Sequence, residues 1–349
     1  MKYLIFLIFI TTPLFAKTYK VKVFSEPAAE EKAREFILNM RNMEPFKQLI
    51  EQNAVVIETS PALINGINCR GGNYGIPRLA QCDLGKVETA CADYDLCPVY
   101  TSVPDIGAGG AKFPIVSSSF PWTTMLHEVV HAFGFTDEYA YTKSETKTYC
   151  PTVANWKNGH SSKEETFKTK EKAEAACKKK ISWCQKAIDS GTQVVQETTN
   201  GKFVIGTPTP ISCPSLTLGV YAGGSCQAKN PASTWRPYFC PTVMGYPTLG
   251  EEYCIVSRRH KIIRSSPNLL PDFYQETIFG IIKKVTGNQN LSFDNREQPV
   301  LGHHAYGIPE IDKLSGHDGE IDYCRESRAP SSVKKTEKDP HANCFSHFK

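Results

Sequence analysis

Hydrophobic and polar residues alternate along residues 18–24, and this period of two predicts a β-strand. Pro27 follows, and the hydrophobic residues between Ala28 and about Arg41 recur on one side of a helix. Residues 53–59 are rich in valine and isoleucine and predict a second strand. The order strand, helix, strand predicts a mixed α/β sheet at the start of the chain.

Residues 65–112 are glycine-rich and irregular, and they contain four cysteines. The glycine run at 107–110 lacks the Lys-Ser/Thr of a phosphate-binding loop and belongs to no dinucleotide-binding fingerprint, so we interpret it as a turn. Residues 113–116 predict a short strand. If this strand forms the rim of a cleft, an extended peptide could pair with it.

Two later segments have the period of an α-helix. Residues 163–189 predict one lysine- and glutamate-rich helix with Cys177 and Cys184 on the same face. In an intact helix these cysteines would lie about 10.5 Å apart, whereas a disulfide tolerates roughly 7 Å between Cα atoms. We therefore expect each of them to pair with another segment. Residues 271–286 predict a second helix, which the following glycine ends.

The chain has 349 residues and 13 cysteines, a number that indicates either disulfides or metal clusters. A net charge of +4 without a long basic stripe argues against a nucleic-acid-binding protein. Hydrophobic residues make up 40% of the chain and charged residues 22%, which excludes wholesale disorder. The length is sufficient to bury a substantial core.

The N-terminus decides between disulfides and metal clusters. Residues 1–16 combine a positive start, an apolar run and a small residue at Ala16, which together are typical of a signal peptide. The apolar run is short for a membrane span. We therefore predict a secreted protein, periplasmic or extracellular, without stable membrane insertion after cleavage. Disulfides are then expected, and the odd number leaves at least one thiol free, metal-bound or intermolecular.

The candidate chemistry is concentrated on one short helix. His127 and His131 are four residues apart, so the helix presents both imidazoles on one face, where they can hold one Zn²⁺. Glu128 is rotated away from both and can act as a general base, which is the HExxH arrangement. Gly134 allows the helix to end in a left-handed turn, and Asp137 can then return as a third ligand. Two core histidines on a structural helix are the alternative interpretation.

This extended motif resembles that of the metzincins, and most closely that of the immunoglobulin-A-peptidase-type metzincins. The resemblance rests on three segments: His127 to Gly134 with Asp137-Glu138-Tyr139, Trp235-Arg236-Pro237 before Cys240 to Gly245, and Glu44-Pro45-Phe46 before Val55-Val56. The HExxHxxGxxD spacing is shorter than in that family and is shared with snapalysin-type enzymes, which leaves Glu138 as an alternative third ligand. The 113-residue step from His131 to Met244 implies an insertion.

The resemblance also implies a fold and a division of the chain. It implies an α+β, metzincin-like fold, with a mixed twisted sheet and the active-site helix in an N-terminal catalytic subdomain at 17–134. An irregular, disulfide-rich C-terminal catalytic subdomain at 135–287 and a polar tail at 288–349 would follow. Met244 would form the methionine turn beneath the metal. Tyr246 would stand where related enzymes carry a tyrosine that stabilises an oxyanion, or else is an ordinary turn residue.

The implied activity is that of a zinc endopeptidase acting on a protein or peptide substrate. Zn²⁺ held by His127, His131 and Asp137 would keep a position open for water, and Glu128 would take the proton of that water as it attacks a peptide carbonyl. One alternative is an exported, disulfide-rich binding or adhesion protein with a structural or latent zinc site. Another is a gluzincin, whose third ligand would be a later glutamate, Glu164 or Glu165. The oligomeric state does not follow from the sequence.

Overall fold

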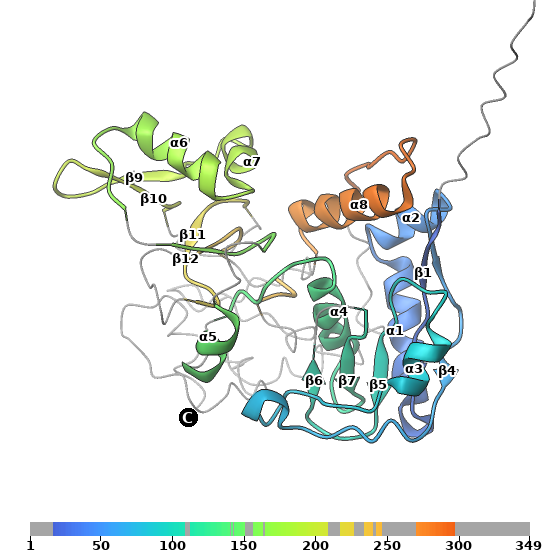
Figure 1. Cartoon of the computed structure of the whole chain (residues 1–349). Helices are drawn as coiled ribbons and strands as arrows, with labels where there is room; N and C mark the ends of the chain where they lie inside the picture. Colours follow the sequence, from blue (N-terminus) through green and yellow to red (C-terminus); the bar gives the residue numbers. More distant parts are fainter. Residues whose placement is uncertain are drawn as a thin grey trace, which may run out of the picture.

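The computed structural model describes residues 17–108, 112–139, 141, 143–150, 156–162, 165–208, 217–226, 234–239, 242–245 and 270–296 (Figure 1). The predicted signal peptide at 1–16 and the part of the polar tail beyond residue 296 lie outside these ranges. The fold is of the α+β class, as predicted, with helices packed on several small sheets.

A mixed sheet forms the centre of the N-terminal half. In spatial order its five strands are β4 (Ala62–Leu63), β2 (Phe24–Ser25), β5 (Val99–Thr101), β7 (Ile115–Ser117) and β6 (Gly107–Ala108). The first four are parallel, and β6 runs antiparallel to β7 at the edge. β1 (Tyr19–Val21) precedes β2 on the same segment and pairs in parallel with β3 (Val55–Ile57). The two strands predicted near the N-terminus are therefore confirmed.

The edge of this sheet differs from the prediction. Gly107 and Ala108 form a strand rather than a turn, although neither residue favours one, because pairing with β7 determines their conformation. The predicted strand at 113–116 is consequently internal, with β5 on one side and β6 on the other. It is not a rim at which a peptide could pair.

Both faces of the sheet are buried, each against a different hydrophobic core. Successive side chains of a strand point to opposite faces, so each strand contributes to both cores. Tyr100 and Val116 face the larger core, to which α1 (Glu30–Asn42) and α4 (Trp122–His131) contribute. The neighbouring residues of the same strands face a smaller core that includes α3 (Gly85–Ala90). A short 3-10 helix, η1 (Pro27–Ala29), precedes α1. This arrangement places α4 inside the molecule, with nine of its ten residues buried.

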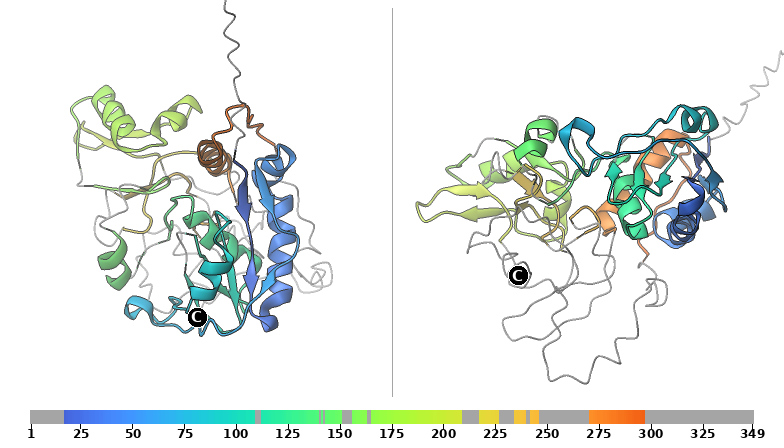
Figure 2. Two further views of the ribbon diagram at one scale, coloured as in Figure 1. Left: turned by 45° about the vertical axis from the view of Figure 1, so that its right-hand side comes forward. Right: turned by 90° about the horizontal axis from the view of Figure 1, so that it is seen from below.

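The chain after α4 forms a second group of elements, and Figures 1 and 2 show α6, α7 and the β9–β10 hairpin on the side of the molecule away from α1. The group comprises α5 (Lys143–Tyr149), α6 (Lys170–Lys180), α7 (Cys184–Asp189), β9 (Val195–Glu197), β10 (Phe203–Ile205), and the antiparallel sheet of β8 (His160–Ser161), β12 (Thr234–Arg236) and β11 (Tyr221–Ala222). The C-terminal part is therefore less irregular than predicted.

The single helix predicted at 163–189 is wrong. α6 ends at Lys180, and Ile181 has extended backbone with φ −111° and ψ 112°, before α7 begins. The helix breaks because Ile181 and Trp183 are both buried in the larger core, whereas residues two apart on one helix point to different sides. The Trp183 indole also donates a hydrogen bond of 2.8 Å to the Gly219 carbonyl.

The same break corrects the predicted cysteine pairing. With the helix interrupted, the Cα atoms of Cys177 and Cys184 lie 5.9 Å apart and the two residues form a disulfide with each other. The described residues contain three further disulfides: Cys69–Cys82, Cys91–Cys97 and Cys150–Cys226. Two of the four precede α4, so disulfides are not confined to the C-terminal part. Such bonds are compatible with folding in an oxidising compartment. The five other cysteines lie outside the described residues.

α8 (Asp272–Thr286) follows its prediction and ends at Gly287, whose φ of 67° is left-handed. It packs against β1 (Figure 1), and the two predicted subdomains contribute to one hydrophobic core. Residues 288–296, the start of the predicted tail, lie on α2 (Phe46–Glu51), where Gln48 and Asp294 exchange two hydrogen bonds. Across the described ranges, no helix has the length and apolarity needed to cross a membrane.

Candidate metal centre

α4 presents the two predicted histidines on one face, as their spacing requires. The His127 and His131 rings lie with centroids 4.7 Å apart, and their Nε2 atoms are separated by 3.2 Å. The helix begins at Trp122, and Gly134 follows it with a left-handed φ of 83°. The Gly134 amide donates a hydrogen bond to the His131 carbonyl, so the glycine reverses the chain towards Asp137 as predicted.

Asp137 completes a cluster with these histidines. Its Oδ1 atom lies 2.9 Å from His127 Nε2 and 3.4 Å from His131 Nε2. The three potential ligand atoms all lie within 4.8 Å of one another, and the carboxylate of Asp137 is buried. The structure thus brings together the three residues that the motif predicts.

The hydrogen bonds of the histidines show that a cation suits this cluster. His127 Nδ1 is 2.8 Å from the Val243 carbonyl and His131 Nδ1 is 2.9 Å from the Phe135 carbonyl. A carbonyl only accepts, so both Nδ1 atoms carry a proton, and each imidazole in its neutral form offers a lone pair at Nε2. Asp137 Oδ1 is buried and receives no hydrogen bond from the described residues. Three electron-pair donors therefore face each other, and a set of two imidazoles and a carboxylate fits Zn²⁺.

The protonation of the cluster leads to the same conclusion. Burial alone would disfavour the imidazolium, but the Asp137 carboxylate outweighs it and raises the pKa of His131 to about 9. Burial likewise opposes ionisation of Asp137, yet the two imidazoles hold the pKa of its carboxyl well below its usual range. In the metal-free protein a proton can therefore occupy the place that suits a metal ion.

Glu128 lies beside this cluster without joining it. Its Oε2 atom is 3.9 Å from His131 Nε2, and a Cβ atom added to Gly107 would lie 3.4 Å from its Oε1 atom. The edge strand β6 therefore passes close to the carboxylate at Gly107. Burial raises the pKa of Glu128, and the neighbouring imidazoles only partly offset this. A carboxylate that is buried, close to the cluster and outside it has the position expected of a general base.

Glu138, the alternative third ligand, points away from the cluster. Its carboxylate accepts hydrogen bonds from Tyr274 Oη, from Thr242 Oγ1 at 2.8 Å and from Asn158 Nδ2 at 3.1 Å. Burial raises the pKa of this carboxyl although these donors oppose the shift. With its oxygens committed to three donors, Glu138 holds the loop in place, and the geometry favours Asp137 as the ligand.

The turn from Thr242 to Gly245, which contains Met244, contacts the cluster through the Val243 carbonyl. The Gly245 amide donates a hydrogen bond of 3.0 Å to the Thr242 carbonyl, and this bond closes the turn. Within the turn, the Val243 carbonyl accepts the hydrogen bond from His127 Nδ1. The Met244 carbonyl accepts a hydrogen bond of 2.8 Å from the Glu138 amide, and its side chain is fully buried. Tyr246 and Glu164 lie outside the described residues. Glu165 forms an ion pair with Lys180 rather than approaching the histidines.

Several residues around the cluster were not predicted as site residues. The Tyr139 ring stacks on His127 with centroids 6.3 Å apart, and Trp156 meets the His131 ring edge-on at 6.0 Å. Asn158 Oδ1 accepts a hydrogen bond of 2.7 Å from the Thr136 amide, and Asn158 Nδ2 donates one of 2.8 Å to the Thr136 carbonyl. These two bonds fix the loop before Asp137. Tyr139 could have been suspected from its place beside the motif, whereas Asn158 and Trp156 carry no local signal.

No family model matches the chain, and neither a curated protein nor a solved structure matches it.

Proposed function

We propose that this protein is a secreted zinc-dependent endopeptidase of the metzincin type. The observation that supports the proposal most strongly is the convergence of His127 Nε2, His131 Nε2 and Asp137 Oδ1, with the Glu128 carboxylate beside them. The Thr242–Gly245 turn against His127 adds the feature that this class of enzyme places below its metal. The four disulfides and the signal-like sequence at 1–16 support export.

Each residue of the site then has a distinct task. His127, His131 and Asp137 would hold the Zn²⁺, which would supply Lewis acidity to polarise a peptide carbonyl and acidify water. Glu128 accepts the proton of the attacking water and delivers it to the leaving amine nitrogen as the C–N bond breaks. The raised pKa of Glu128 suits this task, because the protonated acid persists long enough to donate. Val243 and Phe135 orient the histidines through their carbonyls.

The test compares wild-type protein with Glu128→Ala for zinc content and for cleavage of casein or gelatin. Glu174→Ala, on the surface of α6, is the matched control for loss of a carboxylate. We expect one bound Zn²⁺ in all three proteins, with cleavage by wild type and control and at least a hundredfold less by Glu128→Ala, in keeping with loss of general-base catalysis. Equal cleavage by Glu128→Ala would contradict the peptidase mechanism. Zinc without cleavage by wild type would favour the binding protein with a structural or latent zinc site.

A further inference from the structure

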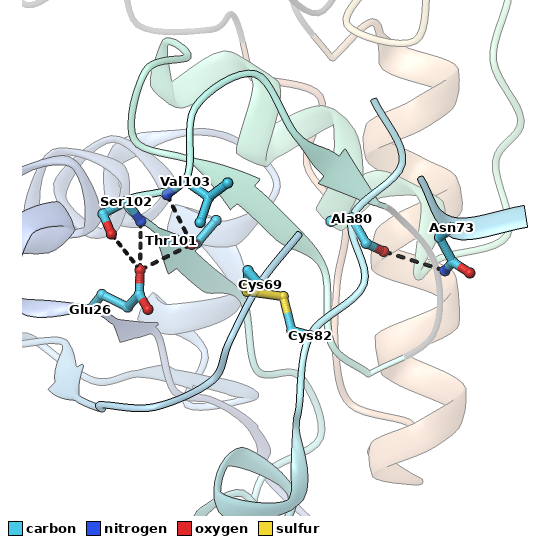
Figure 3. The surroundings of a disulfide bond; sticks show 8 residues. All are labelled: Glu26, Cys69, Asn73, Ala80, Cys82, Thr101, Ser102 and Val103. Atoms are coloured by element: carbon cyan, nitrogen blue, oxygen red, sulfur yellow. Dashed lines mark hydrogen bonds between the residues drawn. A yellow bond between two sulfur atoms is a disulfide. The ribbon is translucent and has the colours of Figure 1, made fainter. Parts of the chain in front are cut away.

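A disulfide-closed loop covers the edge of the sheet next to the candidate metal centre. We call residues 69–82 the strap, because Cys69 and Cys82 join its two ends (Figure 3). Its arms are held together by the backbone hydrogen bonds between Arg70 and Gln81, at 2.9 and 2.8 Å, and by the Asn73 side chain, which donates to the Ala80 carbonyl. The short helix η2 (Asn73–Gly75) forms its tip.

The strap pairs with β6 at Gly107, close to Glu128. The Gly107 amide donates to the Arg78 carbonyl and the Gly107 carbonyl accepts from the Ala80 amide, both at 3.0 Å. Gly107 also lies close to the Glu128 carboxylate, since a Cβ atom added to it would be in van der Waals contact with Oε1. A peptide therefore cannot add to β6 as a further strand at Gly107, because the strap already takes both outward-facing backbone groups. Recognition at this point falls to side chains.

The side chain of Arg78 extends from the strap across the site. Its Nη2 donates to Tyr139 Oη at 3.4 Å, and the Tyr139 ring stacks on His127. The same Nη2 forms an ion pair with Glu145 on α5, and Figures 1 and 2 show the strap as the blue loop that reaches towards this helix. The backbone of Arg78 thus pairs with β6, which passes close to Glu128, and its side chain reaches Tyr139, which stacks on His127.

This guanidinium is fixed in orientation but not enclosed. Half of the Arg78 side chain is exposed, whereas that of Glu145 is 5% exposed. Among the described residues, Nη2 has hydrogen-bond partners, whereas Nε and Nη1 have none. A guanidinium held at one nitrogen offers its other donors in a defined direction, which is the arrangement that recognises carboxylates.

We propose that Arg78 is a specificity-determining residue that binds a carboxylate of the peptide substrate close to the scissile bond. The carboxylate would come from an Asp or Glu side chain or from the C-terminus of the peptide. This inference rests on the proposed peptidase function, and the strap gives it a structural cause. The strap uses the backbone groups of Gly107 with which a peptide could otherwise pair, and it places the Arg78 guanidinium beside the site instead.

The test measures binding of three hydroxamate-capped dipeptides to the zinc-loaded protein. One carries a Glu side chain and an amidated C-terminus, one a Gln side chain and a free C-terminal carboxylate, and one a Gln side chain and an amidated C-terminus. We expect one of the two acidic probes to bind about fivefold more tightly than the neutral probe, the preference expected of a half-exposed ion pair. The probe that is preferred identifies the source of the carboxylate, and the preference should shrink as salt is added.

The variants assign this preference to one side chain. Arg78→Gln should abolish it, while Arg70→Gln should keep it, because Arg70 is an exposed arginine of the same strap with no side-chain interaction among the described residues. If Arg78→Gln lowers the thermal midpoint, the double variant with Glu145→Gln removes the buried negative charge as well and allows the same comparison. Arg78→Lys should retain part of the preference.

The outcomes separate this inference from the proposed function. Equal binding of all three probes to wild type, or a preference that survives in Arg78→Gln, would overturn the role of Arg78 alone. If no probe binds to protein that contains zinc, the peptidase function fails and the role of Arg78 fails with it.

Discussion

At the residue scale, two adjacent carboxylates have opposite roles because neighbouring side chains leave the loop in different directions. Asp137 directs Oδ1 towards the Nε2 atoms of both histidines, whereas Glu138 accepts three hydrogen bonds from other side chains. The sequence could not separate them, since either acid satisfies a short spacing after Gly134. The separation comes from Tyr274, Thr242 and Asn158, which are distant along the chain.

Substitution of these two acids should therefore have different effects. Asp137→Asn should lower zinc affinity at least tenfold, because it replaces the only anionic ligand of the cluster. Glu138→Gln should still bind one Zn²⁺ but lose about 1–3 kcal/mol of unfolding free energy, because a neutral amide disturbs a buried network of three donors. Zinc titration with a competing chelator and urea denaturation measure the two effects. Loss of zinc in Glu138→Gln alone would contradict the assignment of the ligand.

The raised pKa of His131 makes metal binding depend on pH. Because the pKa of His131 is about 9, its imidazole carries a second proton at lower pH in the metal-free protein. Zn²⁺ requires the neutral imidazole. Zinc binding at pH 7 should therefore release close to one proton from His131, and zinc affinity should rise with pH until about pH 9. Calorimetric titrations in two buffers of different ionisation enthalpy count the released protons. No release at pH 7 would contradict this protonation state.

At the scale of the element, a helix or strand could be predicted where the residues that determine it lie close to it in the sequence. α4 and α8 were predicted because their hydrophobic positions and terminal glycines lie within the helix or next to it. The break at Ile181 was missed because no glycine or proline marks it, and it depends on burial of Ile181 and Trp183 in a core formed by distant residues. The edge strand β6 was missed for the same reason, since its Gly-Ala sequence favours no strand.

The disulfide between α6 and α7 should stabilise this break without serving the site. It closes a loop with a sequence separation of 7 residues, so the double variant Cys177→Ala/Cys184→Ala should lose about 2 kcal/mol of unfolding free energy. Zinc affinity should be unchanged, because the hydrogen bonds and ring contacts that orient His127 and His131 come from elements other than these two helices. Denaturation and zinc titration of the same preparation test both statements. Loss of zinc in this variant would show that α6 and α7 support the metal centre.

At the scale of the whole molecule, the candidate site is assembled from segments that lie far apart in the sequence. The ligands come from one local motif, and their spacing could be predicted. The groups that orient and surround them come from the strap, β6, α5 and the Thr242–Gly245 turn. These could not be predicted, because no pattern relates Arg78 to Glu145 across 67 residues. The chemistry is thus encoded locally, and its surroundings are produced by the fold.

Because the ligands and the turn behind them belong to one packed core, metal binding should stabilise the entire chain. A ligand that binds only the folded state at a hundred times its Kd adds about 2.7 kcal/mol, which for a chain of this size corresponds to a rise in Tm of about 4 °C. Calorimetric scans with saturating zinc and with EDTA should show this difference, and added zinc should reverse the effect of EDTA. His131→Ala should melt at the same temperature under both conditions, because it lacks a ligand. If wild type also melts at one temperature with and without EDTA, the cluster does not bind the metal within the folded core.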